Sequence, residues 1–514
     1  MAASVPRLGI VLGALSSATD LAAGVPVGTS VRTCLVATLL ARRLGLSDEQ
    51  VGDAYFTALL RHLGCTAYAH EAAWYGAGDD LDVHRTFEGL GIADRGAALQ
   101  RTVSRLGAGR GLGARTRAVV RMLGAPESGA ALVAAQCEQA STLADDLGLG
   151  SNVVAALEQV FESFDGGGGP ARLRGDAISL PARIFHVASM LEIQHRHRGR
   201  ERAVATLRKQ AGVALDPELV NALLASPEEL WSLLEASSWW DEYLAWEPDP
   251  RSPCDIDVAA RAFAQFADLK SPIFLGHSTA VAELCDRAGA EAGLPLDTRA
   301  VLRRAALLHD LGIVAIPAGI WEKPGALDDA ERDLARSHAF HGARLLGRIP
   351  VLAEEAKIVG LHHERCDGSG YPMGTSVASS ERAARILACA DAYRGMVEER
   401  PHRPAWTPER AADELHRQAK AGALCVRALD SVLGVAGVQA KPAARLPSGL
   451  TEREVAVLSH LARGLTNKEI AVALGIAPKT ARNHVEHIYA KIGVTTRASA
   501  ALFAVRHDLI AIPN

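Results

Sequence analysis

The two halves of this 514-residue chain share an internal repeat, which limits how the chain can fold more than any single motif does. Residues 59–64 (LLRHLG) lie 248 positions before residues 307–312 (LLHDLG). A later block, residues 160–170 (VFESFDGGGGP), aligns with residues 362–372 (HHERCDGSGYP). An internal repeat indicates that one supersecondary arrangement is used twice. We therefore expect two related domains in tandem.

The composition favours a helical fold. Hydrophobic residues make up 48% of the chain and aromatic residues only 5%, and the abundant Ala, Leu and Arg are good helix formers. A chain of this length is too long to fold around a single hydrophobic core, so we expect an all-α protein of several domains. The eight cysteines form no CxxC pair, which excludes a zinc ribbon and fits reduced thiols in the cytoplasm. No run approaches the ~18 to 20 apolar residues of a membrane span, so we expect a cytoplasmic protein.

Histidine and aspartate recur in five short segments of the second half. These segments are Gly276-His277-Ser278, His309-Asp310-Leu311-Gly312, His338 with Gly342, the string from His362 to Pro372, and Asp391. Imidazole and carboxylate ligands without a thiolate suit a hard or borderline divalent ion. In the adjacent pair, the His309 imidazole can bind one ion while the Asp310 carboxylate bridges to a second. The pattern therefore predicts a two-metal hydrolytic centre.

The order and spacing of these segments resemble the HD-GYP phosphohydrolases, all-helical enzymes that open cyclic di-GMP, and the string at residues 362–372 is highly specific to that family. The resemblance implies seven metal ligands, namely His277, His309, Asp310, His338, His362, His363 and Asp391. It implies catalytic roles for Asp310, Arg365 and Tyr371. It implies substrate contacts from Gly368, Gly370, Tyr371, Pro372, Arg400 and Arg403. Because these ligands offer only N and O, we expect two ions, iron or manganese rather than zinc, with magnesium as an alternative.

Two positions depart from the pattern of that family. Ile313 stands where the family has a lysine that contacts the substrate phosphate, and Ile273 stands where some members place a glutamate for a third metal. Loss of a cation that stabilises transition-state charge commonly lowers a rate by ~10²-fold or more. We therefore expect a two-metal centre with a weaker hold on phosphate. Arg365, Arg400 and Arg403 are alternative cations, although the cluster at residues 400–403 is equally consistent with a solvated surface.

The first half of the chain lacks the ligands of the second half. The positions of His277, His309, Asp310, His362, His363 and Asp391 are taken by Thr29, Arg61, His62, Val160, Phe161 and Ser189, in that order. The first half is also longer by 46 residues, because 103 positions separate His62 from Asp165 whereas 57 separate Asp310 from Asp367. We expect a pseudo-domain that holds no metal and serves packing, dimerisation or ligand sensing.

Residues 450–514 have the pattern of a helix-turn-helix. Thr451 with Glu454 and Thr466 with Glu469 form two capping boxes, each a Thr followed by a Glu three residues later. Pro478 opens a third helix. Its apolar positions recur at helical spacing at Ala481, Val485, Ile488 and Ile492. The segment carries eight Lys or Arg and five acids, a balance of +3, so a basic module follows a body with a charge of −7.

The string from Leu450 to Arg497 closely resembles the LuxR-type four-helix DNA-binding domain. The resemblance makes double-stranded DNA the expected partner. On the third helix, the face opposite the apolar residues carries side chains of the types that reach base edges and phosphates in a major groove. The base-reading candidates are Lys479, Arg482 and Asn483, and the phosphate-contact candidates are Lys468, Thr480 and Lys491. The alternative is a small helical bundle for protein contacts.

Together these features predict five segments. They are a degenerate HD-GYP-like domain at residues 1–210, a helical linker at 211–253, an HD-GYP-like metal-dependent phosphohydrolase domain at 254–440, a linker at 441–449 and a LuxR-type domain at 450–514. We expect a homodimeric transcription regulator whose metal domain hydrolyses or senses a nucleotide such as cyclic di-GMP. Two alternatives stay open: a phosphodiesterase whose tail only localises it to DNA, and a nucleotide sensor without turnover, which Ile313 favours.

Overall fold

The computed structural model describes residues 7–90, 95–109, 111–124, 128–236, 238–248, 254–438, 447–462, 464–507 and 509. These residues form α-helices and short 3-10 helices, and they contain isolated β-bridges but no strand, which confirms the all-α expectation. The chain divides into two compact units, the body (residues 1–438) and the tail domain (residues 439–514). Residues 441–446 of the predicted linker at 441–449 lie outside the described residues. No described helix is long and apolar enough to cross a membrane.

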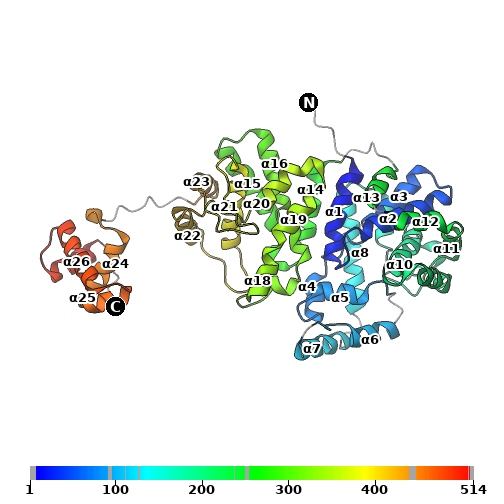
Figure 1. The fold of residues 1–514 in the computed structure, drawn as a ribbon, viewed down its shortest axis with the longest axis horizontal. Coiled ribbons are helices and arrows are strands. Elements are labelled where there is room, and N and C mark those ends of the chain that lie inside the picture. Colours follow the sequence, from blue (N-terminus) through cyan, green and yellow to red (C-terminus); the bar gives the residue numbers. More distant parts are fainter. Residues whose placement is uncertain are drawn as a thin grey trace. The chain divides into compact units, whose positions relative to one another are not determined.

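The body contains most of the helices (Figure 1). Its first half contains α1 (Leu8–Ala22), α2 (Thr29–Arg43), α3 (Asp48–Leu59), α4 (Ala69–Tyr75), α5 (Asp80–Phe87), α6 (Arg95–Ser104), α7 (Leu112–Leu123), α8 (Ser128–Asp146), α9 (Ser151–Leu157), η1 (Gly175–Ala177), α10 (Leu180–Gln210), α11 (Pro217–Leu224), α12 (Pro227–Leu234) and α13 (Trp239–Ala245). Its second half contains α14 (Ile256–Asp268), η2 (Pro272–Phe274), α15 (His277–Glu291), α16 (Leu296–Leu308), η3 (Leu311–Ala315), α17 (Ala318–Trp321), α18 (Asp329–Arg336), α19 (His338–Leu346), η4 (Pro350–Leu352), α20 (Ala353–Leu361), α21 (Arg382–Val397), α22 (Pro408–Lys420) and α23 (Val426–Val435). The tail domain contains η5 (Pro447–Gly449), α24 (Glu452–Ala462), α25 (Asn467–Leu474), α26 (Pro478–Ile492) and α27 (Arg497–Arg506).

The repeat in the sequence is a repeat of structure. The Ser30 hydroxyl donates to the buried Asp20 carboxylate at 2.6 Å, and 248 residues later the Ser278 hydroxyl donates to the buried Asp268 carboxylate at 2.6 Å. Burial raises the pKa of each carboxyl group to about 6, partly offset by the serine hydrogen bond. The helix pairs α2–α3 and α15–α16 therefore begin with the same buried polar contact.

Close packing around two glycines extends the match between the halves. A Cβ on Gly64 would lie 1.9 Å from the carbonyl oxygen of Gln136, and a Cβ on Gly312 would lie 2.0 Å from that of His338. Only glycine fits such an approach between backbones. Gln136 is therefore the counterpart of His338, a correspondence that the sequence comparison left unassigned.

The 46 extra residues of the first half fall between Gly64 and Gln136, in the stretch that contains α4 to α7, which lie at the lower edge of the body in Figure 1. Asp80, the first residue of α5, contacts the second half: its fully buried carboxylate accepts hydrogen bonds from the Lys270 ammonium and, at 2.8 Å, from the Ala318 amide. The Gly319 amide donates to the carbonyl of Gly78 at 3.1 Å. The insertion therefore joins the two halves.

The segment predicted as a helical linker is helical but packs as part of the body. Leu223, Leu230 and Tyr243 of α11 to α13 are fully buried in the core that both halves share. The Tyr243 hydroxyl donates to the Gly9 carbonyl at 2.6 Å. Because these contacts join distant parts of the sequence, residues 211–248 do not act as a spacer. Residues 237 and 249–253 lie outside the described residues.

Candidate metal centre

The seven ligands implied by the sequence come together in the second half of the body, from five places in the chain. His277 opens α15, His309 and Asp310 follow α16, His338 opens α19, His362 and His363 follow α20, and Asp391 lies within α21. Residues at helix ends can point side chains along the helix axis, so four helices deliver imidazoles to one place. His309 and His362 are fully buried, and the others are buried or half-buried.

These residues form two groups of potential metal ligands. His277, His309 and Asp391 form one group, and His338, His362 and His363 form the other. Within each group one ligand atom from each side chain lies within 4.8 Å of the others. The first group offers two imidazoles and a carboxylate, and the second offers three imidazoles, which are donor sets that divalent transition metals accept.

The Asp310 carboxylate lies between the two groups. Its Oδ2 atom is 3.8 Å from His277 Nε2 and 3.5 Å from His309 Nε2. Its Oδ1 atom is 3.4 Å from His338 Nε2 and 4.0 Å from His362 Nε2. One carboxylate therefore presents an oxygen to each group, the geometry expected of a ligand that bridges two ions.

The histidine rings are oriented by hydrogen bonds at their outer nitrogens. The Nδ1 atoms of His309, His338 and His362 donate to the carbonyls of Ala306, Ala335 and Val359 at 2.7, 2.6 and 2.6 Å, and His277 Nδ1 donates to Glu398 Oε2 at 2.8 Å. With Nδ1 protonated, Nε2 carries the free lone pair, the usual arrangement of histidine ligands. In each case that Nε2 faces the centre.

Burial and charge in the site agree with a metal centre. His309 Nε2 is buried without a hydrogen-bond partner among the described residues, which a satisfied core histidine would not leave. Burial lowers the pKa of His362 to about 3, so its ring is neutral and able to bind a metal. Burial alone would raise the pKa of Asp310, but the adjacent imidazoles, His309 foremost, hold it well below its usual value. The side chains present therefore fit divalent ions.

The loop after His363 is fixed by a buried glutamate. Glu364 Oε1 accepts from the Met373 amide at 2.6 Å, and Oε2 accepts from the Thr375 amide at 2.9 Å. A Cβ on Gly370 would lie 2.5 Å from Glu364 Cα, so glycine is required there. The Tyr371 ring consequently stacks on His363 with centroids 4.5 Å apart. Gly368 has a φ of 79°, Pro372 is exposed, and Arg365 is half-buried beside the loop.

The two arginines predicted to contact substrate are engaged within the protein. Arg400 donates to the Ile273 carbonyl at 2.7 Å and to Glu398 Oε2 at 3.1 Å. Arg403 donates to the carbonyls of Met396 and Pro404 at 3.0 Å, at the end of α21. Carbonyls left unpaired at a helix end attract such a cation, so these guanidinium groups support α21 and the ring of His277 through Glu398.

Three other residues at the site were missed by the sequence comparison. Glu398 orients His277, the Trp321 ring lies edge-on to His338 at 5.8 Å, and the Arg336 guanidinium lies 5.2 Å from the Tyr371 ring centroid. No motif marks them, because each reaches the site through tertiary packing. Ile313, at the position of the family lysine, is buried with 1% exposure.

The matching site of the first half holds no such groups. Arg61 and Ser189 occupy the positions of His309 and Asp391, and the Arg61 guanidinium donates to Ser189 Oγ at 2.8 Å. Among the described residues, both groups of potential metal ligands belong to the second half.

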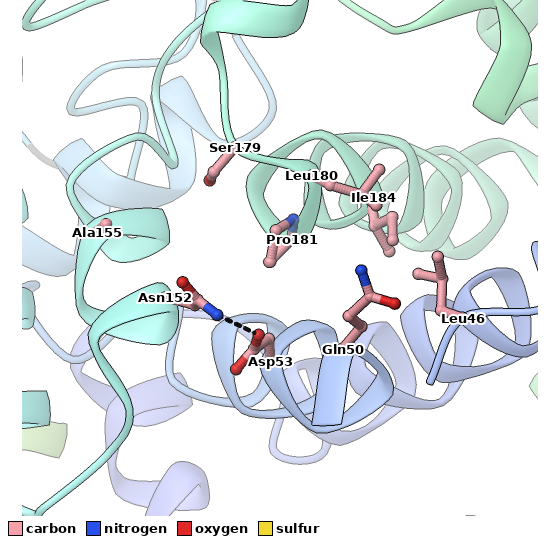
Figure 2. A pocket seen from close by; sticks show the side chains of 9 residues that line it. All are labelled: Leu46, Gln50, Asp53, Asn152, Ala155, Ser179, Leu180, Pro181 and Ile184. Carbon is pink, nitrogen blue, oxygen red and sulfur yellow. Dashed lines mark hydrogen bonds between the residues drawn. The ribbon is translucent and has the colours of Figure 1, made fainter. Parts of the chain in front are cut away.

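A cavity of about 230 Å³ lies elsewhere in the first half, between α3, α9 and α10 (Figure 2). Asn152 donates to Asp53 at 2.9 Å across it. Ala155 and Ser179, which line this cavity, occupy the positions in the repeat that Lys357 and Glu381 occupy in the second half. Lys357 and Glu381 form an ion pair at 2.9 Å. Smaller side chains therefore account for this space.

The tail domain has its own core, and the two capping boxes predicted from the sequence are confirmed. The Glu454 and Glu469 amides donate to the hydroxyls of Thr451 and Thr466 at 3.2 and 3.4 Å, and each glutamate accepts the threonine amide in return. Ala481, Val485 and Ile488 of α26 are buried. All six DNA-contact candidates are exposed, namely Lys468, Lys479, Thr480, Arg482, Asn483 and Lys491.

Lys491 also contacts groups within the tail domain. Its ammonium pairs with Glu454 Oε2 at 2.7 Å and donates to the Gly449 carbonyl at 3.0 Å. The side chain of Glu454 is 6% exposed. Because this carboxylate would otherwise be buried without a cation, Lys491 stabilises the tail domain, and its phosphate contact stays a prediction.

Two family models match the chain. An HD-domain family model matches residues 129–219 and 261–423, and the model described as "Bacterial regulatory proteins, luxR family" matches residues 448–504. The 3'3'-cGAMP-specific phosphodiesterase 3 of Vibrio cholerae is 28% identical over 405 residues, which are 77% of this chain and 88% of that protein. A cyclic di-GMP phosphodiesterase of Pseudomonas aeruginosa is 36% identical over 147 residues, 28% of this chain and 34% of that protein.

A solved structure shares the fold. The crystal structure of a cyclic GMP-AMP specific phosphodiesterase of V. cholerae superimposes with a TM-score of 0.59 at 23% identity, covering 85% of this chain and 99% of the other. The chain therefore belongs to the HD-domain proteins homologous to HD-GYP cyclic dinucleotide phosphodiesterases, and it carries a luxR-family DNA-binding domain in its tail.

Proposed function

We propose that the second half of the body is a two-metal phosphodiesterase for cyclic dinucleotides and that the tail domain makes the protein a DNA-binding regulator. The observation that carries the proposal is the Asp310 carboxylate, whose oxygens lie 3.4 to 4.0 Å from imidazoles of two separate groups. The seven ligands are His277, His309, Asp310, His338, His362, His363 and Asp391. The named specificity of the relative that matches over 88% of its length makes 3'3'-cGAMP a candidate substrate beside cyclic di-GMP.

Different residues of the chain have different roles in the proposed hydrolysis. A bound metal pair supplies Lewis acidity and an activated water. Tyr371, stacked on His363, borders the site, and Arg336 and Arg365 bring positive charge beside it. These cations compensate in part for Ile313, whose burial keeps it from the substrate. In the reaction the water oxygen bonds to phosphorus, the ester oxygen leaves and takes up a proton, and a linear dinucleotide with a terminal phosphate monoester results.

The test is hydrolysis by the full-length protein after reconstitution with manganese or iron. We expect turnover of 3'3'-cGAMP or cyclic di-GMP, and its loss in Asp310→Asn. His341→Ala is the matched control, since His341 lies on α19 with His338 but belongs to neither ligand group. Full activity of Asp310→Asn would refute the assignment of the centre.

A second candidate function is nucleotide sensing without turnover, and Ile313 is the observation that favours it. A lysine is absent where the family contacts phosphate, and a buried isoleucine offers no charge in its place. Binding of a cyclic dinucleotide by the metal-loaded protein, with the ligand recovered intact, would support the sensor and exclude the phosphodiesterase.

The regulator half of the proposal requires two copies of the tail domain. Residues 450–514 carry a charge of only +3, so one copy should bind duplex DNA weakly, whereas a homodimer can hold two tails on half-sites about one helical turn apart. Full-length protein should therefore bind a selected site much more tightly than residues 439–514, a compact unit with its own core. Equal affinities at matched salt would exclude dimeric recognition.

A further inference from the structure

Two aromatic side chains lie beside the metal centre and contact both of its ligand groups. The Trp321 ring, at the end of α17, lies edge-on to the His338 ring with centroids 5.8 Å apart and edge-on to the Phe274 ring at 5.4 Å. The Phe274 ring in turn lies 6.4 Å from the His277 ring. Because His338 and His277 belong to different ligand groups, Trp321 and Phe274 together pack against a histidine of each group.

Packing of this kind completes the orientation of a histidine ligand. The hydrogen bond from His338 Nδ1 to the Ala335 carbonyl, at 2.6 Å, fixes one point of the ring but leaves its tilt free. An aromatic edge packed against the ring restricts that tilt. Loss of a group that orients a ligand commonly lowers metal affinity ~10- to 100-fold. The affinity of the second ligand group therefore depends on where Trp321 lies.

Contacts from the first half of the body hold α17 in place. An isolated helix of fewer than ~12 residues is not stable in water, and α17 has four, so Trp321 depends on contacts outside this helix. Ala318 is fully buried against α4, and its amide donates to Asp80 Oδ1 at 2.8 Å. The Gly319 amide donates to the Gly78 carbonyl at 3.1 Å. Both acceptors belong to the insertion, the stretch that contains α4 to α7.

The residue after α17 also contacts the insertion. Glu322 Oε2 pairs with His70 Nδ1 of α4 at 2.9 Å, and Glu322 Oε1 accepts from the Ser271 hydroxyl at 2.8 Å. Ser271 immediately precedes η2, the short helix that carries Phe274. Glu322 therefore connects α4 to the segments that carry both aromatic side chains.

We propose that Trp321 is a positioning residue of the metal centre and that the insertion holds it against His338. Among the described residues, the first half contributes to neither ligand group, yet its Gly78 and Asp80 fix the helix that carries Trp321. The proposal rests on the metal centre of the proposed function but not on turnover, so metal binding tests it directly.

The first test compares two glycine substitutions in the full-length protein. A Cβ on Gly319 would lie 2.4 Å from Gly78 Cα, so Gly319→Ala should displace α17 from the insertion without altering any ring. Gly325→Ala is the matched control, because Gly325 is exposed and a Cβ there meets no atom within 4 Å. In competition with a chelator, we expect Gly319→Ala to bind manganese ~10-fold more weakly and Gly325→Ala to match the wild-type protein.

Substitutions of Trp321 itself provide the second test. Trp321→Ala should lower metal affinity by a similar factor. It should also shift the visible absorption spectrum of the cobalt(II)-loaded protein, which reports the geometry of the ligands. Trp321→Phe keeps an aromatic edge for His338 and should restore most of the affinity and the wild-type spectrum. A side chain that only fills space would leave the cobalt spectrum unchanged in Trp321→Ala.

The outcomes separate this proposal from the phosphodiesterase. Equal metal affinity and equal cobalt spectra of Trp321→Ala and the wild-type protein would overturn the positioning role and leave the metal centre standing. A loss of affinity in Trp321→Ala but not in Gly319→Ala would overturn the role of the insertion. A wild-type protein that takes up no metal would overturn both the centre and the positioning role. Thermal melting shows which variants are folded, and the Trp321 variants decide the positioning role even where Gly319→Ala is not.

Discussion

The Arg61 guanidinium donates a hydrogen bond to Ser189 Oγ at 2.8 Å, at the two positions that His309 and Asp391 hold in the second half. The first half therefore has a guanidinium charge at the position where the second half has ligands for a metal cation. Burial lowers the pKa of Arg61, while Glu192, Glu88 and Asp20 counter that effect, and the group stays charged at neutral pH. Such a charge repels divalent ions.

The full-length protein should therefore bind metal only through its second half. We expect two divalent ions per chain after reconstitution, measured by elemental analysis. His309→Ala should remove metal, whereas Arg61→Ala should leave the metal content of the second half unchanged and add none, because Val160 and Phe161 offer no ligand atom. Metal retained in full by His309→Ala would contradict the assignment.

A second prediction concerns the residue that orients His277. Glu398→Gln should weaken metal binding about 10- to 100-fold, the usual effect of losing a partner behind a histidine ligand, since Glu398 Oε2 accepts from His277 Nδ1 at 2.8 Å. The measurement is metal affinity by competition with a chelator. Glu399→Gln, at the exposed neighbouring residue, is the control. If both variants bound metal alike, Glu398 would have no role in positioning the ring.

The metal centre and the tail domain illustrate what the sequence could and could not predict. The ligand set, the repeat and the helix-turn-helix depend on local motifs whose spacing survives in the printed sequence, so their residues could be named. Glu398, Trp321 and Arg336 reach the site only through tertiary packing. Arg403 and Lys491 look like free cations in sequence, yet the structure pairs them with carbonyls and with Glu454.

The contacts of the insertion with the second half also could not be predicted from the sequence. The sequence showed only that the first half is longer by 46 residues. The contact of Asp80 with Lys270 follows from no pattern, because a single Asp and a single Lys 190 residues apart have no sequence signal. Likewise the shared core makes the two predicted halves one compact unit. The boundary between them at residues 211–253 stays a prediction.

The buried pair of Asp80 and Lys270 gives the third prediction. Both side chains are fully buried, so Lys270→Met leaves an uncompensated carboxylate and should lower the free energy of unfolding of the body by ~3 to 5 kcal/mol. Lys270→Met combined with Asp80→Leu should be less destabilised than Lys270→Met alone, although the Ala318 amide then loses its acceptor.

Tryptophan fluorescence during denaturant unfolding measures this effect, because all seven tryptophans lie in the body. Lys357→Met is the matched control, since it removes an exposed lysine from an ion pair with Glu381 and should cost ~1 kcal/mol or less. Equal destabilisation by Lys270→Met and Lys357→Met would mean that the buried pair does not join the halves.

The last prediction concerns the cations of the tail domain that we expect to contact DNA and the lysine that pairs with Glu454. Lys468 is exposed on α25, so Lys468→Ala should weaken binding to all duplexes alike and reduce the slope of affinity against salt by about one. Asn483→Ala should cost ~1 to 3 kcal/mol at a selected site and relax sequence preference. Lys491→Ala should instead lower the melting temperature of the domain, because Glu454 would lose its ion-pair partner at 2.7 Å. Thermal melts of residues 439–514 beside duplex titrations at several salt concentrations make the comparison. A Lys491→Ala variant with an unchanged melting temperature and a reduced salt slope would show that Lys491 contacts DNA and does not stabilise the domain.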